Sequence, residues 1–429
     1  MGLSALGARN RWRYTASMSV HFLFVVCQVG SEATVKNEIA RKHPSFRFAF
    51  SRRGFLTFRI PDEVARDRKF ELNCVFARTW GFSFGKAIGT DGRQLAREFW
   101  KPFVERYPVD VLSQFRHLHV WQRDRFVPGD SDFEPGITPL AEGIGELILE
   151  QQPDVSIADH QVHEPADASP RLDVPQKPGT STLRLTGNSI TWSLALNEDA
   201  NVDDRILDCV IVEPNEWWFG WHRANAVETR WPGGVPVIDS PDNMISRAYL
   251  KIEEALRWSE LPVQAGDRFV EVGSSPGGSC QALLDRGCLV TGIDPAEMDP
   301  LLLANPNFTH LRSRAKKVER NDFQSFRWLA MDANVAPKYT LDTVEAIVTQ
   351  PSVHIEGLLL TLKLTDLALA AELPLFHKRI RSWGYRRVRA RQLAFNRQEV
   401  CVVATDAAMH HRRSDFSNDS LSQSTIAGP

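Results

Sequence analysis

The hydrophobic pattern of the first 72 residues predicts a small strand–helix–strand unit. An apolar run at His21–Val29 indicates a strand, and Ser31–Arg41 places apolar residues at helical spacing. A second strand is predicted at Gly54–Ile60, because a Pro-Asp pair ends the apolar run there. We therefore expect an α+β module at residues 18–72, preceded at residues 1–17 by an unstructured or over-extended start.

A second unit is predicted at residues 73–204. Apolar residues recur at helical spacing in Gly92–Arg106 and Pro139–Glu150. Residues 151–180 then carry five prolines among Asp, Glu, Ser and Gln, a composition that is typical of a linker or an exposed loop. Alternating apolar positions between residues 182 and 196 predict two short strands at the end of the unit.

From about residue 205, short apolar runs alternate with helical stretches. This alternation predicts an α/β domain at residues 205–404, with a doubly wound, mostly parallel sheet covered by helices on both faces. The polar residues 405–429 that follow are expected to be a disordered tail. The predicted strands of the domain are Phe269–Val272, Leu289–Ile293, Trp328–Met331, Leu358–Leu362 and Val400–Ala404.

Composition narrows the possible functions. A chain of 429 residues with 43% hydrophobic and 24% charged residues fits a globular protein of two or three domains. Because the formal net charge is −2, any surface that binds nucleic acid must be a local basic patch. The six cysteines are scattered without a C-x-x-C pair, so we expect reduced thiols and neither a disulfide framework nor a bound metal. No apolar run is long enough to span a membrane, and we expect a cytoplasmic monomer or weak dimer.

A loop of small residues follows the strand Phe269–Val272 and precedes a helix. Glycines let the main chain approach a ligand, and Asp294 ends the next strand, where a carboxylate can accept hydrogen bonds from ribose hydroxyls. The loop lacks the G-x-G-x-x-G pattern, which disfavours NAD or FAD and favours S-adenosylmethionine (SAM), although a tight turn without a ligand stays open. The residues predicted to contact the cofactor are Gly273, Ser274, Ser275, Pro276, Gly277, Gly278, Asp294 and Asp332.

Two charged residues end predicted strands beside this loop. Lys363 follows the apolar run Leu358–Leu362, and Asp332 follows Trp328–Met331. A lysine at such a place can act as a general base if its pKa is lowered. Asp332 could instead cap a turn, whereas a lysine directly after a buried apolar strand is less common. Lys251 could form a surface salt bridge on a helix, and Glu399 could be an edge residue of the last strand.

Five stretches of the catalytic half together resemble the FtsJ-type RNA 2′-O-methyltransferases. They are SRAYLKIEEA, GSSPGG, LAMDA, LLLTLKL and RARQLAFNRQEVCVV. The resemblance implies a K-D-K-E tetrad of Lys251, Asp332, Lys363 and Glu399, with Lys363 as the base and the other three residues orienting it or the ribose. Lys251 is then expected to depress the pKa of Lys363 as a nearby cation. The branch of the family that is most similar methylates a cytidine ribose of large-subunit ribosomal RNA, and its upstream modules are ferredoxin-like and THUMP-type.

A basic segment near the end of the predicted domain is the candidate RNA surface. Aromatic residues at Trp383 and Tyr385 lie among its cations, and such residues can stack on unpaired bases. The alternative is that an exposed helix and strand carry their arginines into water. The residues predicted to bind RNA are Lys378, Arg379, Arg381, Arg386, Arg387 and Arg389.

Two departures from the family pattern keep a second function open. The loop carries Ser274 and Ser275 where small apolar residues or cysteine are usual, and basic residues follow the third strand where an acid often lies near the adenine. The alternative is a methyltransferase-fold protein that binds RNA without catalysing a reaction. The four tetrad residues argue for the enzyme.

Overall fold

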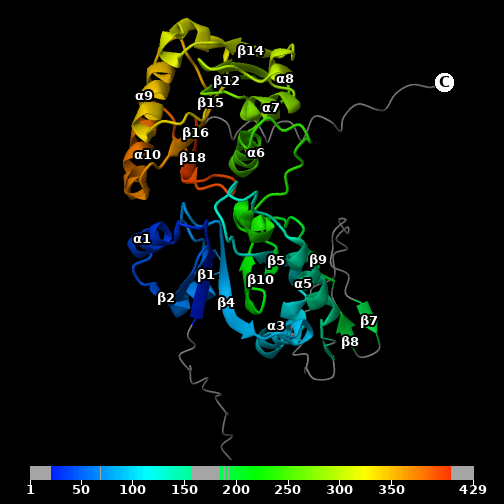
Figure 1. Ribbon diagram of the computed structural model, residues 1–429. Coiled ribbons are helices and arrows are strands. Elements are labelled where there is room, and N and C mark those ends of the chain that lie inside the picture. Colours follow the sequence, from blue (N-terminus) through cyan, green and yellow to red (C-terminus); the bar gives the residue numbers. More distant parts are fainter. Residues whose placement is uncertain are drawn as a thin grey trace, which may run out of the picture.

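A computed structural model shows the protein as two layers that lie one above the other (Figure 1). The expectations for residues 1–17, for most of the linker at 151–180 and for the tail from residue 407 fall outside the described part of the chain. In the described part, none of the helices combines the length and the apolar character that are needed to cross a membrane. The described residues are 21–67, 69–107, 109–153, 155–156, 184–186, 189–191 and 193–406.

The lower layer of Figure 1 is built on an eight-stranded sheet. Strand β1 (His21–Val26) lies inside it, because four of its six residues are apolar and fully buried. Helix α3 (Gly92–Arg106) begins where the Asp91 side chain accepts hydrogen bonds from two backbone N–H groups, and Thr138 caps α5 (Pro139–Glu150) in the same way. In spatial order the strands are β2 (Arg47–Arg52), β3 (Phe55–Ile60), β1, β4 (Thr79–Ile88), β11 (Glu216–Arg223), β10 (Arg205–Glu213), β5 (Phe115–Gln122) and β9 (Ala195–Leu196).

This one sheet joins the two units that we expected to be separate modules. Strand β4 pairs with β1 on one side and with β11 on the other. Strands β10 and β11, which we had assigned to the catalytic domain that starts at residue 205, also belong to this sheet. The remaining described elements of the layer are α1 (Glu32–Lys42), α2 (Asp62–Arg66), α4 (Val109–Leu112) and a small sheet of β6 (Val155–Ser156), β8 (Ser189–Thr191) and β7 (Arg184–Thr186).

The upper layer is the expected doubly wound α/β domain, and its sheet has seven strands. The first five are parallel, and β18 pairs antiparallel with both β16 and β17. This order places β12 and β15 at the centre, with apolar residues buried on both faces. In spatial order the strands are β14 (Phe308–Leu311), β13 (Leu289–Ile293), β12 (Arg268–Val272), β15 (Trp328–Met331), β16 (Gly357–Lys363), β18 (Glu399–Thr405) and β17 (Arg387–Arg391).

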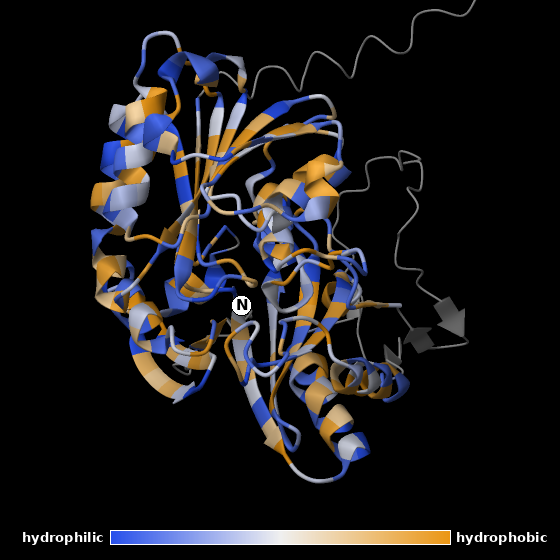
Figure 2. Cartoon of the chain, turned by 45° about the horizontal axis from the view of Figure 1, so that its top comes forward, coloured by the Kyte–Doolittle hydropathy of each residue, from blue (hydrophilic) through white to orange (hydrophobic). Residues whose placement is uncertain are grey.

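Helices cover both faces of this sheet. Helices α6 (Ala248–Ser259), α7 (Gly278–Asp285) and α8 (Pro300–Leu303) pack on the face that carries Phe269 and Trp328. Helices α9 (Pro337–Val348) and α10 (Leu373–Ser382) pack on the opposite face, against Leu329 and Leu360. Hydrophobic and hydrophilic residues alternate along these helices, as expected when one side faces a core (Figure 2). Short 3-10 turns connect them: η2 (Glu228–Arg230), η3 (Pro232–Gly234), η4 (Ala315–Lys317), η5 (Arg320–Ser325) and η6 (Leu367–Glu372).

A network of buried polar contacts lies where the two layers meet. Arg78 forms two short contacts with the Asp124 carboxylate, at 2.5 and 2.9 Å, and its Nε donates to the carbonyl oxygen of Gly233. Arg391 of β17 in turn donates to the carbonyl oxygens of Ala77 and Arg78, so a strand of the upper sheet is tied to the lower layer. All six cysteines are buried and carry free thiols.

Candidate active site

Glycines give the loop that connects β12 to α7 its backbone conformation. Gly273 and Gly277 have φ angles of +79° and +124°, which side chains other than glycine rarely adopt. A Cβ atom on Gly273 would lie 2.9 Å from the Cβ of Ala333, closer than such atoms approach. The main chain is therefore free of side chains at the end of the central strand, where a ligand of a doubly wound sheet binds.

Asp294 holds this loop as well as facing it. Its two carboxylate oxygens accept hydrogen bonds from Ala296 N at 2.8 Å and from Ser275 N at 3.3 Å. The Ser275 hydroxyl donates to the carbonyl oxygen of Glu297 at 2.8 Å. The Ser274 side chain is buried below the loop beside Met298, so only its backbone can face a cofactor. Each carboxylate oxygen keeps a further lone pair, with which Asp294 can accept hydrogen bonds from a ribose.

Gly278, the first residue of α7, lets that helix approach the start of α6. A Cβ atom on Gly278 would lie 2.7 Å from the carbonyl oxygen of Ser246 and 3.1 Å from the backbone nitrogen of Tyr249. Because those are backbone atoms, the two helix ends must move apart, and α6 carries Lys251. We expect Gly278→Ala to lower the activity of this site at least tenfold.

The matched control for that prediction is Gly143→Ala in α5, where an added Cβ meets no atom within 4 Å. Thermal unfolding and methyl transfer measured side by side should show an unchanged or slightly more stable control with full activity. A Gly278→Ala protein with full activity would contradict the close packing of α6 on α7 as a requirement of the site.

The structure brings Lys251, Asp332, Lys363 and Glu399 into one cluster. The Lys251 Nζ lies 3.2 Å from Asp332 Oδ2 and also contacts Glu399 Oε1. The Lys363 Nζ lies 2.9 Å from Asp332 Oδ1 and contacts Glu399 Oε2. Each carboxylate therefore bridges both ammonium groups, and the four charges alternate around a closed ring. Register explains half of this ring, since Lys363 and Glu399 lie directly opposite each other on β16 and β18.

The charges of the ring set its protonation. Burial alone would raise the pKa of Asp332, but Lys251 and Lys363 outweigh burial and lower it. Burial would lower the pKa of Lys363, but Asp332 and Glu399 outweigh burial and raise it. We had expected Lys251 to depress the pKa of Lys363, and that expectation is wrong for the ring as it stands. The two carboxylates lie closest to the Lys363 ammonium, so they dominate and keep it protonated.

Two buried glutamates lie close to the ring, and neither was predicted from the local sequence pattern. Glu254, on the same helix as Lys251, accepts hydrogen bonds from the backbone nitrogens of Ala394 and Phe395 at 2.8 and 3.0 Å. It fixes the loop that leads into Glu399, and burial raises its pKa to about 7. Glu271 lies on β12 below the glycine loop, where burial raises its pKa to about 8. Lys251, Glu271 and Asp332 line a cavity of about 20 Å³.

The basic segment that we predicted to bind RNA lies away from the ring. Arg387 of β17 is opposite Thr405, at the far end of β18 from Glu399. The six residue-to-residue steps from Glu399 to Thr405 span about 20 Å. Arg379 pairs with Asp342 and Glu345, and Arg389 donates to the carbonyl oxygens of Trp258 and Ser259. The exposed members of the segment are Lys378, Arg381, Arg386, Arg387 and Arg389.

A second set of cations lies at the same edge of the sheet as the glycine loop. It follows the carboxyl end of β14, which runs parallel to β13 and β12. Arg312 forms an ion pair with Glu297 at 3.2 Å, next to the loop residue Asp294. The exposed cations of this set, called the β14 patch below, are Arg312, Arg314, Lys316 and Lys317.

Comparisons with known proteins find methyltransferases that resemble this domain. Residues 244–373 match the family model of the FtsJ-like methyltransferases. Ribosomal RNA large subunit methyltransferase M of Halorhodospira halophila is 30% identical over 191 residues, which cover 42% of this chain and 53% of the relative. The enzyme of the same name from Shewanella amazonensis is 26% identical over 268 residues, 59% of this chain and 66% of the relative. The chain thus spans about half to two thirds of the length of these curated relatives.

Among solved structures, TrmN from Thermus thermophilus aligns with 90% of this chain and 99% of its own. The sequence identity is 13% and the TM-score is 0.28.

Proposed function

We propose that the FtsJ-like methyltransferase domain formed by residues 244–373, with SAM as its cofactor, enables this chain to methylate a ribose 2′-hydroxyl of large-subunit ribosomal RNA. The observation that carries the proposal is the closed ring of two lysines and two carboxylates at the carboxyl edge of the sheet. The ring lies beside a loop whose main chain is open to a nucleoside. The curated relatives, by their printed names, act on large-subunit ribosomal RNA.

The residues present fit SAM. Gly273 and Gly277 take positive φ angles that leave the loop without side chains at these two positions, and the Asp294 carboxylate lies at the end of the neighbouring strand. SAM supplies the methyl group on a sulfonium. Lys363 would have to lose its ammonium proton to water before it could act as a base, and a bound cation near the ring would favour that loss because a like charge favours the neutral amine.

Lys363 then accepts the proton of the 2′-hydroxyl as the oxygen attacks the methyl carbon. Asp332 and Glu399 hold the amine between them, and Lys251 forms ion pairs with both carboxylates. The chief gain is alignment of the hydroxyl, the methyl group and the amine. The cytidine specificity rests on the family resemblance, as does an RNA-binding role for the lower layer.

Mapping of 2′-O-methyl groups on ribosomal RNA tests the proposal. RNA from cells with and without the gene should differ at one large-subunit cytidine, and purified protein with SAM should restore the group. A methyl group on a base, or no site that depends on the protein, would overturn the proposed reaction. Binding of RNA and SAM without transfer would point to the non-catalytic alternative.

The rate of methyl transfer is expected to rise with pH. Because the pKa of Lys363 is raised, the amine is mostly protonated at neutral pH, and its neutral fraction grows about tenfold for each pH unit below that pKa. Single-turnover rates with saturating SAM and RNA should therefore increase from pH 6.5 to 8.5. A flat profile over this range, with chemistry shown to be rate-limiting, would mean that Lys363 does not act as the base.

The β14 patch is proposed to contact RNA close to the target ribose, and the basic segment of α10 and β17 to contact a more distant part. Changing Arg314, Lys316 and Lys317 together to glutamate should weaken RNA binding at least tenfold. The slope of log K against log salt should fall by about two, as for three lost phosphate contacts to single-stranded RNA. Arg386→Glu with Arg387→Glu, measured in the same titrations, reports on the other segment. Unchanged affinity in the triple variant would exclude the β14 patch.

A further inference from the structure

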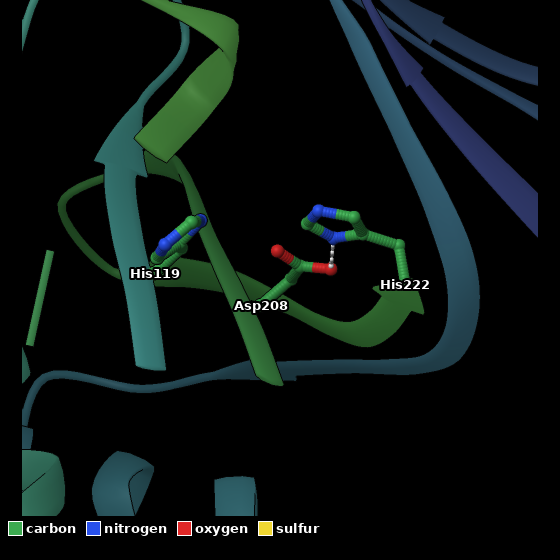
Figure 3. Close-up of side chains that lie close together, drawn as sticks. All are labelled: His119, Asp208 and His222. Carbon is green, nitrogen blue, oxygen red and sulfur yellow. Dashed lines mark hydrogen bonds and ion pairs between the residues drawn. The ribbon is translucent and has the colours of Figure 1, made fainter. Parts of the chain in front are cut away.

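Three buried side chains of the lower layer lie close together (Figure 3), on a different sheet from the one that carries the proposed active site. His119 is on β5, Asp208 on β10 and His222 on β11, three neighbouring strands of one sheet. Their exposed fractions are 0%, 0% and 1%. Asp208 lies directly opposite His119 in the ladder between β10 and β5, so both side chains point to the same face. Polar groups buried this deeply need partners.

Both imidazole rings are oriented by backbone carbonyl groups. The His119 Nε2 lies 2.9 Å from the carbonyl oxygen of Glu198, and the His222 Nε2 lies 2.7 Å from that of Thr229. A carbonyl oxygen only accepts hydrogen bonds, so each Nε2 carries the hydrogen. In both rings Nδ1 is therefore the nitrogen left for another partner, and in His222 it lies 2.7 Å from Asp208 Oδ2. Histidines that bind metals are commonly held in this way, with the other ring nitrogen donating to a carbonyl.

Two acceptors of the cluster lack a partner. The His222 Nδ1 lies 2.7 Å from Asp208 Oδ2, but among the described residues neither His119 Nδ1 nor Asp208 Oδ1 has a hydrogen-bonding group. A charged His119 ring with an unsatisfied N–H would be costly in this core, so its Nδ1 presents a lone pair. The lone pairs of His119 Nδ1 and Asp208 Oδ1 could both be satisfied by one positively charged group that binds between them.

We propose that His119, Asp208 and His222 form a binding site for a divalent transition-metal ion, with zinc as the ion that suits them best. The donors are two imidazole nitrogens and a carboxylate oxygen, which zinc accepts in tetrahedral sites. The three ligand atoms lie within 4.8 Å of one another, and zinc bonds of about 2.0–2.2 Å would draw them closer. On binding, the hydrogen between His222 Nδ1 and Asp208 leaves as a proton, and that nitrogen donates its lone pair to the ion.

Such an ion would be structural. The three ligands are buried away from solvent and from any substrate. They would cross-link β10 to its two neighbours, β11 and β5. Thr229 lies in η2 beside Glu228, whose carboxylate forms an ion pair with Arg391 of the upper layer at 3.2 Å. The metal would therefore also stiffen the point where η2 holds the catalytic layer. The spacing of the cysteines led us to expect no metal. The ligands proposed here are two histidines and an aspartate, so the cysteine spacing does not bear on them.

Metal analysis of the full-length chain, purified without a polyhistidine tag, tests the site. We expect about one zinc per chain in the wild type, less than a fifth of that in His119→Gln and His222→Gln, and an unchanged content in His354→Gln, which removes an exposed histidine. Wild-type protein that holds no transition metal, both as purified and after refolding with zinc, would overturn the proposal.

A second measurement covers the case in which the two variants fail to fold. Wild-type protein refolded with zinc should melt at a higher temperature than protein refolded with a chelator, and anomalous scattering at the zinc edge should place the ion between the three side chains. Equal melting temperatures, a water molecule at that place, or zinc bound only at surface histidines would each refute the site.

Discussion

Lys363→Ala is expected to reduce methyl transfer by about three orders of magnitude while SAM binding changes less than about threefold. A positioned general base typically contributes 10²–10⁴ to a rate, and alanine leaves no group that can take the hydroxyl proton. The Lys363 amine touches both carboxylates of the ring, whereas the glycine loop and Asp294 lie on other strands. Transfer of labelled methyl groups to ribosomal RNA gives the rate, and calorimetry gives the affinity for SAM.

Lys338→Ala is the matched control, because Lys338 is an exposed lysine on α9 of the same domain. It should behave as the wild type in both measurements. If Lys363→Ala kept more than about a tenth of the wild-type rate, the base would have to be sought elsewhere in the ring.

Asp124→Ala is expected to lower the free energy of unfolding by about 3–5 kcal/mol, the usual effect of leaving one charge of a buried pair alone. Arg78 and Asp124 are 4% and 2% exposed, and their contact is bidentate. Without the carboxylate, the guanidinium stays buried among backbone atoms that also anchor Arg391. Denaturant titrations followed by tryptophan fluorescence would measure the change.

Arg66→Ala is the control for that loss. Arg66 pairs with Asp62 on the surface, with exposed fractions of 74% and 46%, so its removal should change stability by less than about 0.5 kcal/mol. If the two variants were equally stable, the buried contact between Arg78 and Asp124 would not contribute to the stability of the fold.

Five strands of the upper sheet were predictable because each is a short, mostly apolar run between polar turns. Phe269–Val272 and Trp328–Met331 begin and end within a residue of β12 and β15. Strands β10 and β11 are as apolar, and nothing local tells which sheet they join. Their partners settle it: β10 pairs in parallel with β5, about 90 residues earlier in the chain. Such long-range pairing leaves no mark on the local pattern.

The candidate site divides in the same way. Asp332 and Lys363 were predictable from the chain alone, because polar residues at the carboxyl ends of parallel strands share an edge. Lys251 and Glu399 required the family resemblance, since a helix and an antiparallel strand give no such rule. The protonation of Lys363 and the distance of Arg387 from the ring depend on side-chain contacts and on the register of β17.

The sheet order has a consequence for synthesis of the protein. Strand β18 is the last described strand, yet it inserts between β16 and β17 and supplies Glu399 to a ring whose other members precede it by 36 residues or more. A chain still on the ribosome with this segment inside the exit tunnel has a complete glycine loop but an open ring. We therefore expect the ring of four charges to close only after this last strand has left the ribosome.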